Sequence, residues 1–440
     1  MKKFDLLILG FGKGGKTLAK FASAQGKKVA VVEQSQKMYG GTCINIGCIP
    51  SKTLVHEGLE NGSFKQAFDR KAEVVSALNK KNYHNLADDE NIVVLDYKAA
   101  FKSNTEVDLL DEQGEIVETI TADDIIINTG ATPVIPEIKG VNESKYLYDS
   151  TGIMNLSTQP KRLVIVGGGY IALEFASMFA NFDTEVTVLE AHAQLMPRED
   201  EEVVAQAISD LKDKGVNVVL NAKTSEFEDK ENHTLVKTDK GEFEADAVLL
   251  ATGRKPNTDL NLNNTDIVLG ERGEIKVNPQ LQTTVEHIYA IGDVKGGMQF
   301  TYISLDDYRI IKDTLFGTGN RTTENRGNVP YTVFIDPPLS RVGLTAKEAK
   351  EQGFEIKEGK LPVNNIPRHK INNDTRGLFK AVIDANTSKI LGATLYGLQS
   401  EEMINLVKLA MDQNIDYTVL RDNIYTHPTM IESFNDLFNI

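Results

Sequence analysis

The only two cysteines of the 440-residue chain, Cys43 and Cys48, lie in the segment Y-G-G-T-C-I-N-I-G-C-I-P-S-K. Cysteines this close support three interpretations: buried free thiols, metal ligands or a redox-active disulfide. A metal site is the weakest, because no second ligand pair is near and His56 alone does not complete a tetrahedral set. The sequence therefore predicts no resident metal and leaves free thiols and a catalytic disulfide open.

The spacing of the cysteines restricts the local backbone. Residues five apart in a regular helix have Cα atoms roughly 8–9 Å apart, whereas a disulfide joins Cα atoms about 4.4–6.8 Å apart. The segment between Cys43 and Cys48 is therefore not a regular helix when oxidised, and Gly47 and Pro50 predict a loop or a distorted first turn. A helix that begins near this point would lower a thiol pKa through its dipole.

Two segments of the chain repeat one pattern: an apolar run, a glycine-rich turn, a helical stretch and a second apolar run that ends in an acid. In both copies the acid lies 23 residues after the first glycine. Such a turn places a dinucleotide pyrophosphate at a helix N-terminus, and the acid can accept from a ribose hydroxyl group. The residues are Gly10, Gly12, Gly15 and Glu33 in the first copy, and Gly167, Gly169, Ala172 and Glu190 in the second.

Later strands support two dinucleotide-binding modules. I-I-I-N precedes Thr129-Gly130, and V-L-L-A precedes Thr252-Gly253. The first module has extra length that holds both cysteines and a helical stretch over about residues 51–88. Further on, the segment I-Y-A-I-G-D predicts a short strand that delivers Asp293 to a turn.

The C-terminal part has a different pattern from about residue 328. Alternating apolar residues predict strands with A-N-T-S as a hairpin turn, and S-E-E-M-I-N-L-V-K-L-A-M-D predicts a helix. The predicted fold class is α/β, with two Rossmann-like dinucleotide-binding domains and a C-terminal α+β dimerisation domain. The expected boundaries are 1–150 for the first part of one nucleotide domain, 151–260 for the other, 261–327 for the second part of the first, and 328–440 for the C-terminal domain.

The charge and the apolar content of the chain restrict the kinds of partner that we expect. Acids outnumber bases by 63 to 48, and the formal charge of −15 disfavours nucleic acid. No apolar run approaches the roughly 20 residues that span a bilayer. The apolar run after the basic start is broken by Gly10, Gly12 and Lys13, so we expect no export signal and a cytoplasmic protein.

Together these residues resemble the flavin-dependent class I pyridine nucleotide–disulfide oxidoreductases, which include dihydrolipoamide dehydrogenase, glutathione reductase and mercuric reductase. The resemblance covers essentially the whole chain, and its most specific parts are G-G-T-C-I-N-I-G-C-I-P-S-K, the paired glycine motifs, A-I-G-D and H-P-T-M-I-E. Within the family, N-L-A-D, F-T-Y-I-S-L-D-D-Y-R and P-P-L-S-R-V-G are most similar to the bacterial reactive-chlorine-resistance flavoproteins and the related hypothiocyanous acid reductases.

The resemblance implies that the first module binds FAD and the second binds NAD(P)H. It also implies a homodimer in which the C-terminal domain of the partner completes the active site. Glu190 favours NADH because it would repel a 2′-phosphate, whereas Ala172 is shared with NADPH-using relatives and keeps NADPH open. The implied cofactor-binding residues are Gly10, Gly12, Gly15, Glu33, Gly41, Thr42, Lys52, Thr129, Gly130 and Asp293, with Gly167, Gly169, Tyr170, Glu190 and Gly253.

The resemblance also implies the catalytic roles. Hydride from the nicotinamide reduces the flavin, which reduces a Cys43–Cys48 disulfide; Cys48 faces the flavin and Cys43 meets the substrate. His427 is the implied proton donor, and Glu432 orients it. Lys52 and Glu174 form a pair near the flavin, and Tyr170 covers the nicotinamide pocket.

The leading function is reduction of a small thiol-reactive oxidant such as hypothiocyanous acid. The alternatives are a dihydrolipoamide dehydrogenase subunit, a cupric or mercuric ion reductase acting through Cys43, Cys48 and His427, and a non-catalytic redox sensor. The C-terminus lacks the extra cysteine pair of mercuric reductases. Tyr425, two residues before His427, is expected to narrow the pocket against dihydrolipoamide.

Overall fold

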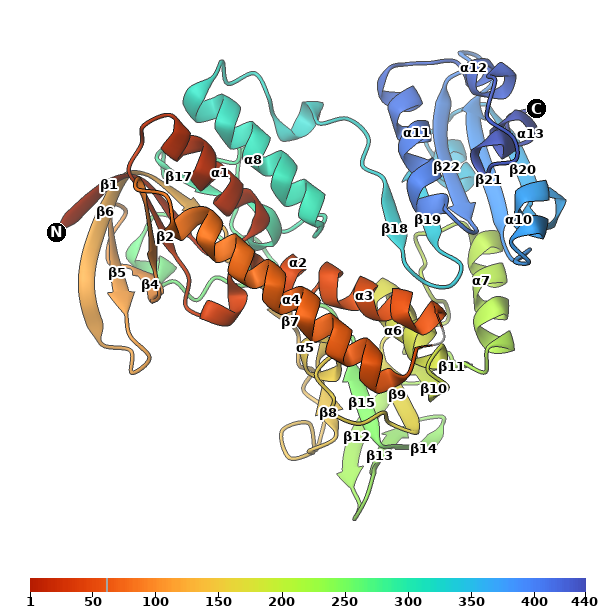
Figure 1. Cartoon of the computed structure of the whole chain (residues 1–440), viewed down its shortest axis with the longest axis horizontal. Helices are drawn as coiled ribbons and strands as arrows, with labels where there is room; N and C mark the ends of the chain where they lie inside the picture. The colour runs from red at the N-terminus through yellow and green to blue at the C-terminus, as the bar shows by residue number, and fades with distance from the viewer. Residues whose placement is uncertain (61) are drawn as a thin grey trace.

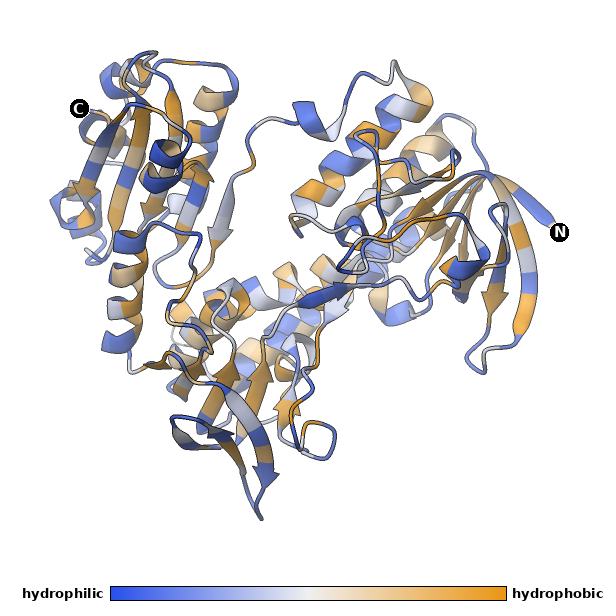
Figure 2. Ribbon diagram, turned by 180° about the vertical axis from the view of Figure 1, so that it is seen from behind, coloured by the Kyte–Doolittle hydropathy of each residue, from blue (hydrophilic) through white to orange (hydrophobic). Residues whose placement is uncertain are grey.

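The computed structural model describes residues 1–60 and 62–440, and it arranges them around three main sheets (Figure 1). The two termini lie at opposite ends of the longest axis of the chain (Figure 1). Apolar residues concentrate on the strands, and polar residues dominate the outer helix faces (Figure 2). The fold is α/β with two Rossmann-like domains and a C-terminal domain, which confirms the predicted class.

The first nucleotide domain is built on a seven-stranded sheet of order β3-β2-β1-β6-β5-β4, with β17 paired to β6. The central strand β1 pairs in parallel with β2 and β6, and it is fully buried at its carboxyl end, as a strand covered on both faces must be. The bounds are β1 (Lys2–Leu9), α1 (Lys13–Ala24), β2 (Val29–Val32), η1 (Gln36–Met38), α2 (Gly41–Asn45), α3 (Cys48–Leu59), α4 (Phe64–Ala87), β3 (Ile92–Leu95), β4 (Lys98–Phe101), β5 (Glu106–Leu110), β6 (Ile116–Ile127), β7 (Ala131–Pro133), η2 (Leu262–Asn264), β17 (Ile288–Ala290), η3 (Gly292–Lys295) and α8 (Thr301–Phe316).

The helical stretch expected over about 51–88 is two helices, α3 and α4, rather than one. The second begins at a capping box in which the Gln66 backbone N–H donates to the Ser63 hydroxyl (3.3 Å) and the Ser63 backbone N–H donates to the Gln66 side chain (3.4 Å). Asn61, between the two helices, lies outside the described residues. The short strand β17 ends just before Asp293, as predicted.

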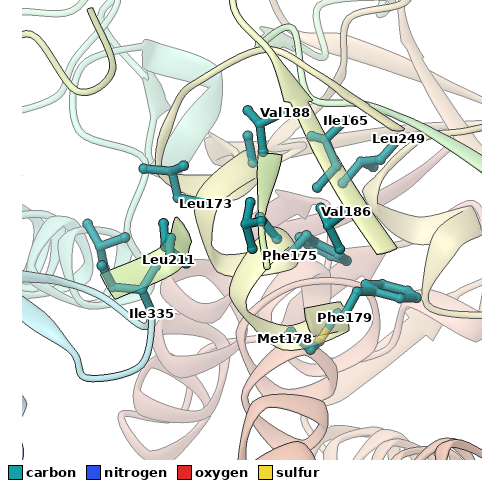
Figure 3. Packing of buried hydrophobic residues seen from close by; sticks show 14 of the residues in the cluster. Ile165, Leu173, Phe175, Met178, Phe179, Val186, Val188, Leu211, Leu249 and Ile335 are labelled. Atoms are coloured by element: carbon teal, nitrogen blue, oxygen red, sulfur yellow. The ribbon is translucent and has the colours of Figure 1, made fainter. Parts of the chain in front are cut away.

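The second nucleotide domain repeats the order strand, helix, strand in a five-stranded parallel sheet of order β11-β10-β9-β15-β8. Helix α6 is buried along nearly its whole length, and its apolar residues pack in one cluster with residues of strands β9, β10 and β15 on one side and with Leu211 and Ile335 on the other (Figure 3). The bounds are β8 (Leu147–Tyr148), α5 (Ser150–Ile153), β9 (Arg162–Val166), α6 (Tyr170–Ala180), β10 (Glu185–Leu189), α7 (Glu201–Asp213), β11 (Asn217–Val219), β12 (Thr224–Asp229), β13 (Thr234–Thr238), β14 (Gly241–Ala245), β15 (Ala247–Leu250) and β16 (Arg254–Pro256).

The C-terminal domain is an antiparallel sheet of order β18-β19-β22-β21-β20. Both the predicted hairpin, β21 to β22, and the predicted helix, α11, are confirmed. The bounds are η4 (Thr323–Asn325), β18 (Tyr331–Val333), β19 (Leu339–Gly343), α9 (Ala346–Glu351), β20 (Ile356–Pro362), η5 (Val363–Asn365), α10 (Pro367–Ile371), β21 (Leu378–Asp384), β22 (Ile390–Tyr396), α11 (Ser400–Asp412), α12 (Tyr417–Asp422), η6 (Ile431–Ser433) and α13 (Phe434–Leu437).

Candidate active site

The first sheet delivers four predicted residues to one edge. Strands β1, β2, β6 and β17 run in parallel, so their carboxyl ends meet. Gly10, Glu33, Thr129 and Asp293 follow these four strand ends in turn. This edge is where open α/β sheets bind their ligands.

A cavity of about 1420 Å³ opens at that edge. Its volume exceeds the roughly 300–1,000 Å³ of sites for small ligands, as a dinucleotide requires. Thirteen predicted residues line it: Gly10, Gly12, Glu33, Gly41, Thr42, Cys43, Cys48, Lys52, Thr129, Gly130, Tyr170, Glu174 and Asp293.

The residues of the first glycine motif fit the phosphates of FAD. Gly12 is the N-cap of α1, and both Gly12 and Lys13 line the cavity. A Cβ atom on Gly41 would lie 2.8 Å from the Cα of Gly12, so both loops need glycine to leave the cradle open. Gly15 does not line the cavity; its Cβ would meet Ile8 at 2.7 Å, which is the close contact between helix and strand that the third position of the motif serves.

Glu33 is held at the end of β2 by two backbone donors. The N–H of Phe11 donates to one carboxylate oxygen (3.1 Å) and the N–H of Ser35 donates to the other (3.1 Å). Burial raises the pKa of Glu33. The carboxylate lies in the cavity wall, where it can meet a ribose hydroxyl group.

Asn128 organises this edge, and the sequence analysis missed it. Its side-chain oxygen accepts from the N–H of Gly15 (2.9 Å), and its amide nitrogen donates to the carbonyl oxygen of Ile291 (3.0 Å). The residue thereby joins α1, β6 and the turn that carries Asp293. The available signal was a difference between the repeats, because Ala251 occupies the matching position before the second T-G turn.

The second glycine motif forms a separate site at the carboxyl ends of β9, β10 and β15. Gly167, Gly169, Glu190 and Gly253 lie at these ends but do not line the large cavity. Gly169 is the N-cap of the buried helix α6, and no heavy atom lies within 4 Å of where its Cβ would be. The open space and the helix N-terminus fit the pyrophosphate of a nicotinamide coenzyme.

The cysteine segment is a helix break. Cys43 lies in α2, the helix stops at Ile46 and Gly47, and Cys48 is the first residue of α3. The structure thus confirms that residues 43–48 are not a regular helix. Both residues are free thiols in the structure; Cys43 is half-buried and Cys48 is exposed to the cavity.

The two thiols differ in their readiness to ionise. The neighbouring Cys43 thiol lowers the pKa of Cys48 to about 6 against the effect of burial, and Thr301 and Lys52 lower it further. The Thr301 hydroxyl group lies 3.4 Å from the Cys48 sulfur. Contact with Cys48, followed by burial, raises the pKa of Cys43 well above its usual range. In the reduced pair the negative charge therefore resides on Cys48.

Lys16, which the sequence analysis did not single out, approaches the cysteine segment from α1. Its ammonium group donates to the carbonyl oxygen of Gly40 (3.4 Å), the N-cap of α2, and to the side chain of Asn82. Burial, followed by Lys13, lowers the pKa of Lys16 to about 8. The positive charge of Lys16 lowers the pKa of Cys43, against the larger effects that raise it.

Lys52 and Glu174 join the two nucleotide domains. The ammonium group of Lys52 lies 2.6 Å from Glu174 Oε2, and Glu174 Oε1 accepts from the N–H of Phe334 (2.9 Å). Lys52 also lies over the Phe334 ring, 4.8 Å from its centroid. Tyr170, one turn before Glu174 on α6, presents its ring to the cavity, and burial raises its pKa.

His427 and Glu432 form a pair outside the cavity. A carboxylate oxygen of Glu432 lies 2.7 Å from His427 Nδ1, and the other accepts from the N–H of Thr429 (3.1 Å). The His427 side chain is 73% exposed. Within one chain the structure does not bring this pair to the cysteines.

Over residues 1–60 and 62–440, no three or more His, Cys, Asp or Glu side chains come together as a metal site. No helix of the same described part combines the length and the apolar character needed to cross a bilayer.

This fold and site define a class of protein. The family description "pyridine nucleotide-disulphide oxidoreductase" matches residues 4–307, and the dimerisation domain of the same family matches residues 329–438. The chain belongs to this family of flavoprotein oxidoreductases with disulfide reductase activity, which use FAD and NAD(P)H.

Individual relatives are similar along the whole chain. It is 50% identical to the probable pyridine nucleotide-disulfide oxidoreductase RclA of Escherichia coli, over 100% of both chains. It is 34% identical to a mercuric reductase of Staphylococcus aureus, over 98% of this chain and 81% of the relative. A solved Cu(II) complex of the HOCl-induced flavoprotein disulfide reductase RclA from Escherichia coli has a TM-score of 0.97 at 50% identity, covering 100% of this chain and 99% of that one.

Proposed function

We propose that this chain is a homodimeric NAD(P)H-dependent reductase of a small thiol-reactive oxidant, with hypothiocyanous acid as the substrate. The observation that carries the proposal is the cysteine pair at the cavity wall, where the pKa of Cys48 is lowered to about 6 and that of Cys43 is raised. The similarity to a reductase described as HOCl-induced supports an oxidant of this kind.

FAD bound in the large cavity would supply the two-electron transfer from the nicotinamide coenzyme to the cysteine pair. The residues of this chain bind and orient it: Gly12 and Gly41 leave room for the phosphates, and Glu33 accepts from a ribose hydroxyl group. Lys52, fixed by Glu174, places a positive charge at the cavity wall near Cys48.

The two pKa values indicate that the thiol of Cys43 must lose a proton before it can react. Cys43 keeps its proton in the reduced pair, so a base must remove that proton before the sulfur can attack. The exposed His427, held by Glu432, is a suitable base, but it needs a second copy to bring it to the cysteines. The dimerisation domain of residues 329–438 supports that arrangement. The imidazolium formed in this way can then protonate the leaving oxygen.

In the substrate step, a thiolate displaces the oxygen from the sulfur of the oxidant. The Cys43 thiolate attacks the sulfur of hypothiocyanous acid, a sulfur–sulfur bond forms, the sulfur–oxygen bond breaks, and the departing hydroxide takes a proton to become water. The Cys48 thiolate then attacks the Cys43 sulfur and expels thiocyanate. The cysteine pair loses two electrons to the oxidant and becomes a disulfide.

Stopped-flow oxidation of the NADH-reduced holoenzyme tests the substrate. The acceptors are hypothiocyanous acid, lipoamide, glutathione disulfide and cupric ion, and we expect hypothiocyanous acid to be fastest. Cys43→Ser should abolish this turnover and leave flavin reduction intact. Full turnover of hypothiocyanous acid by Cys43→Ser would contradict the mechanism, and the absence of turnover with any acceptor would favour a redox sensor.

NADH is the proposed coenzyme. Glu190 Oε1 accepts from the backbone N–H of His192 (2.7 Å), so the carboxylate is fixed at the end of β10, where a ribose 2′-phosphate would meet its charge. We also propose that the protein is cytoplasmic, because reduced coenzyme is available there.

Cupric ion reduction is a second candidate, favoured by the Cu(II) complex solved for the related protein. For the dihydrolipoamide alternative, the narrowing of the pocket by Tyr425 stays a prediction. The Tyr425 hydroxyl group donates to the carbonyl oxygen of Leu420 (3.0 Å), and its ring lies edge-on to Phe434 in the core of its own domain. The stopped-flow comparison of lipoamide with the other acceptors tests the dihydrolipoamide alternative. Co-purification with an acyltransferase core would favour it.

A further inference from the structure

A second cavity, of about 480 Å³, lies behind the cysteine segment between η1, α2, α4 and α5. We call it the cationic cavity and define it by six of its lining residues, which are Lys37, Lys71, Lys80, Asn45, Asn79 and Asn155. In the part of the chain that the structure describes, neither a carboxylate nor an arginine lines it. A cavity lined by lysines and no carboxylate is unusual in a chain with a formal charge of −15.

Lys71 is the unusual residue of this cavity. It projects from α4 and is only 7% exposed, and its ammonium group donates to the side-chain oxygen of Asn155 (3.1 Å). Over the described ranges none of the three lysines forms an ion pair with a carboxylate within 4.0 Å. Burial lowers the pKa of Lys71, and no acid opposes that effect. A buried charge without a counter-charge is costly, and a bound anion would offset the cost.

One acid beside the cavity is held by two of the lining residues. Asp96 accepts from the Tyr39 hydroxyl group (2.5 Å) and from the Gln36 amide (2.9 Å), and both of these residues line the cavity. Asp96 itself does not line the cavity, and it forms no ion pair with the three lysines.

The cationic cavity adjoins the cysteine segment. The Asn79 amide donates to the side-chain oxygen of Asn45 (2.9 Å), and the Asn45 amide donates to the carbonyl oxygen of Gly41 (2.9 Å), two residues before Cys43. Ile46 and Met154 line both this cavity and the large one. An occupant would therefore contact the residues that fix the first turn of α2.

We propose that the cationic cavity binds a small phosphate-bearing molecule. Three lysines match a group that carries about −1.5 to −2 charges, and lysine binds phosphate as a point charge, whereas a carboxylate is matched better by the planar fork of arginine. The volume lies within the roughly 300–1,000 Å³ of small-molecule sites, so the cavity has room for an organic part beside the phosphate. This inference does not depend on which acceptor the cysteines reduce.

Isothermal titration of the FAD-loaded dimer, without coenzyme and in phosphate-free buffer, tests the site with two probes, inorganic phosphate and ribose 5-phosphate. We expect binding of both, and tighter binding of the sugar phosphate if the organic part of the ligand is recognised. Lys71→Met should weaken binding by about tenfold or more, since it removes a charge-assisted hydrogen bond. The matched control is Lys65→Met on the same helix, whose lysine is exposed and paired with Asp69 outside the cavity.

Thermal unfolding separates this role from a structural one. Lys71→Met keeps the length of the side chain and removes an uncompensated buried charge, so its unfolding temperature in phosphate-free buffer should equal or exceed that of the wild type. Phosphate should raise the unfolding temperature of the wild type and of Lys65→Met, but not that of Lys71→Met. Lys80→Met, at an exposed position, should weaken binding by a few-fold without affecting the fold. Unchanged phosphate affinity in Lys71→Met, or no binding by the wild type, would overturn the proposal.

Discussion

The ammonium group of Lys52 lies 2.6 Å from a carboxylate oxygen of Glu174, and this contact crosses from the first nucleotide domain to the second. The other oxygen of Glu174 accepts from the backbone of Phe334, at the start of the C-terminal region. The Glu174 side chain is 8% exposed and that of Lys52 is 31% exposed, so a largely buried carboxylate fixes a partly exposed cation at the cavity wall.

Two substitutions separate the charge of Glu174 from its hydrogen bond. Glu174→Gln keeps an acceptor for Phe334 but releases Lys52, and we expect flavin reduction by NADH to slow by about tenfold or more. Glu174→Ala should also lose about 2 kcal/mol of stability, because the Phe334 N–H is left without its acceptor. Stopped-flow absorbance and thermal unfolding measure these effects, with the exposed Glu185→Gln as the control. An unchanged reduction rate in Glu174→Gln would rule out an electrostatic role for the pair.

The low pKa of Cys48 should depend on the group at position 43. Cys43→Ala removes the contact that lowers this pKa most, so the value should rise from about 6 toward the ordinary value of about 8.5. Cys43→Ser keeps a hydroxyl donor and should leave the pKa closer to 6. The pH dependence of iodoacetamide alkylation of the single remaining thiol measures both. The Cys48 thiolate should predominate above the measured pKa and disappear below it, and identical profiles for the two variants would show that the contact is unimportant.

Lys16 should favour the thiolate of Cys43. In a Cys48→Ser background, Lys16→Met is expected to raise the pKa of Cys43 by about one pH unit, because it removes a nearby positive charge. Lys16 has a pKa of about 8 beside the neutral thiol, and a Cys43 thiolate next to it would stabilise its ammonium form. Alkylation profiles again provide the measurement. Lys20→Met, on the same helix and paired with Asp89 at the surface, should leave the profile unchanged; a shift of equal size there would point to a general charge effect.

If a second copy supplies His427, two inactive variants should complement each other. Cys43→Ser and His427→Ala should each be inactive as homodimers, whereas a mixed dimer contains one site with both residues intact. Random assembly from co-expressed chains makes about half of the dimers mixed, so about a quarter of the wild-type turnover should return. Each variant expressed alone and mixed after purification provides the baseline. No recovery in verified mixed dimers would place His427 outside the active site.

The preference for NADH over NADPH should depend on the negative charge of Glu190. Glu190→Gln removes the charge that repels a 2′-phosphate, so kcat/KM for NADPH relative to NADH should rise by about tenfold. Steady-state kinetics with both coenzymes measure the ratio, and Glu185→Gln, at an exposed position at the start of the same strand β10, is the control. An unchanged ratio would show that selectivity lies elsewhere in the second glycine site.

The family, the fold class and thirteen of the residues that line the large cavity could be predicted from local sequence. Gly10 and Gly167, the first glycines of the two motifs, adopt positive φ in their turns, a requirement that depends on the local backbone. The helix break at residues 46–47 was predicted from the geometry of a disulfide together with Gly47 and Pro50. Asn128 and Lys16 were missed because their partners lie far away in the chain, at Ile291 and Asn82.

The sequence by itself determined the chemistry available to this protein: two thiols at a spacing that breaks a helix, two nucleotide-binding turns and an acid after each. Only the tertiary structure decided which thiol carries the charge, because the pKa of Cys48 depends on Cys43, Thr301 and Lys52, which reach it from separate segments. Tertiary packing also turned Tyr425 into its own domain and left Lys71 buried without a counter-charge. Burial and electrostatic effects of this kind arise between segments that are distant in the chain, so no local pattern records them.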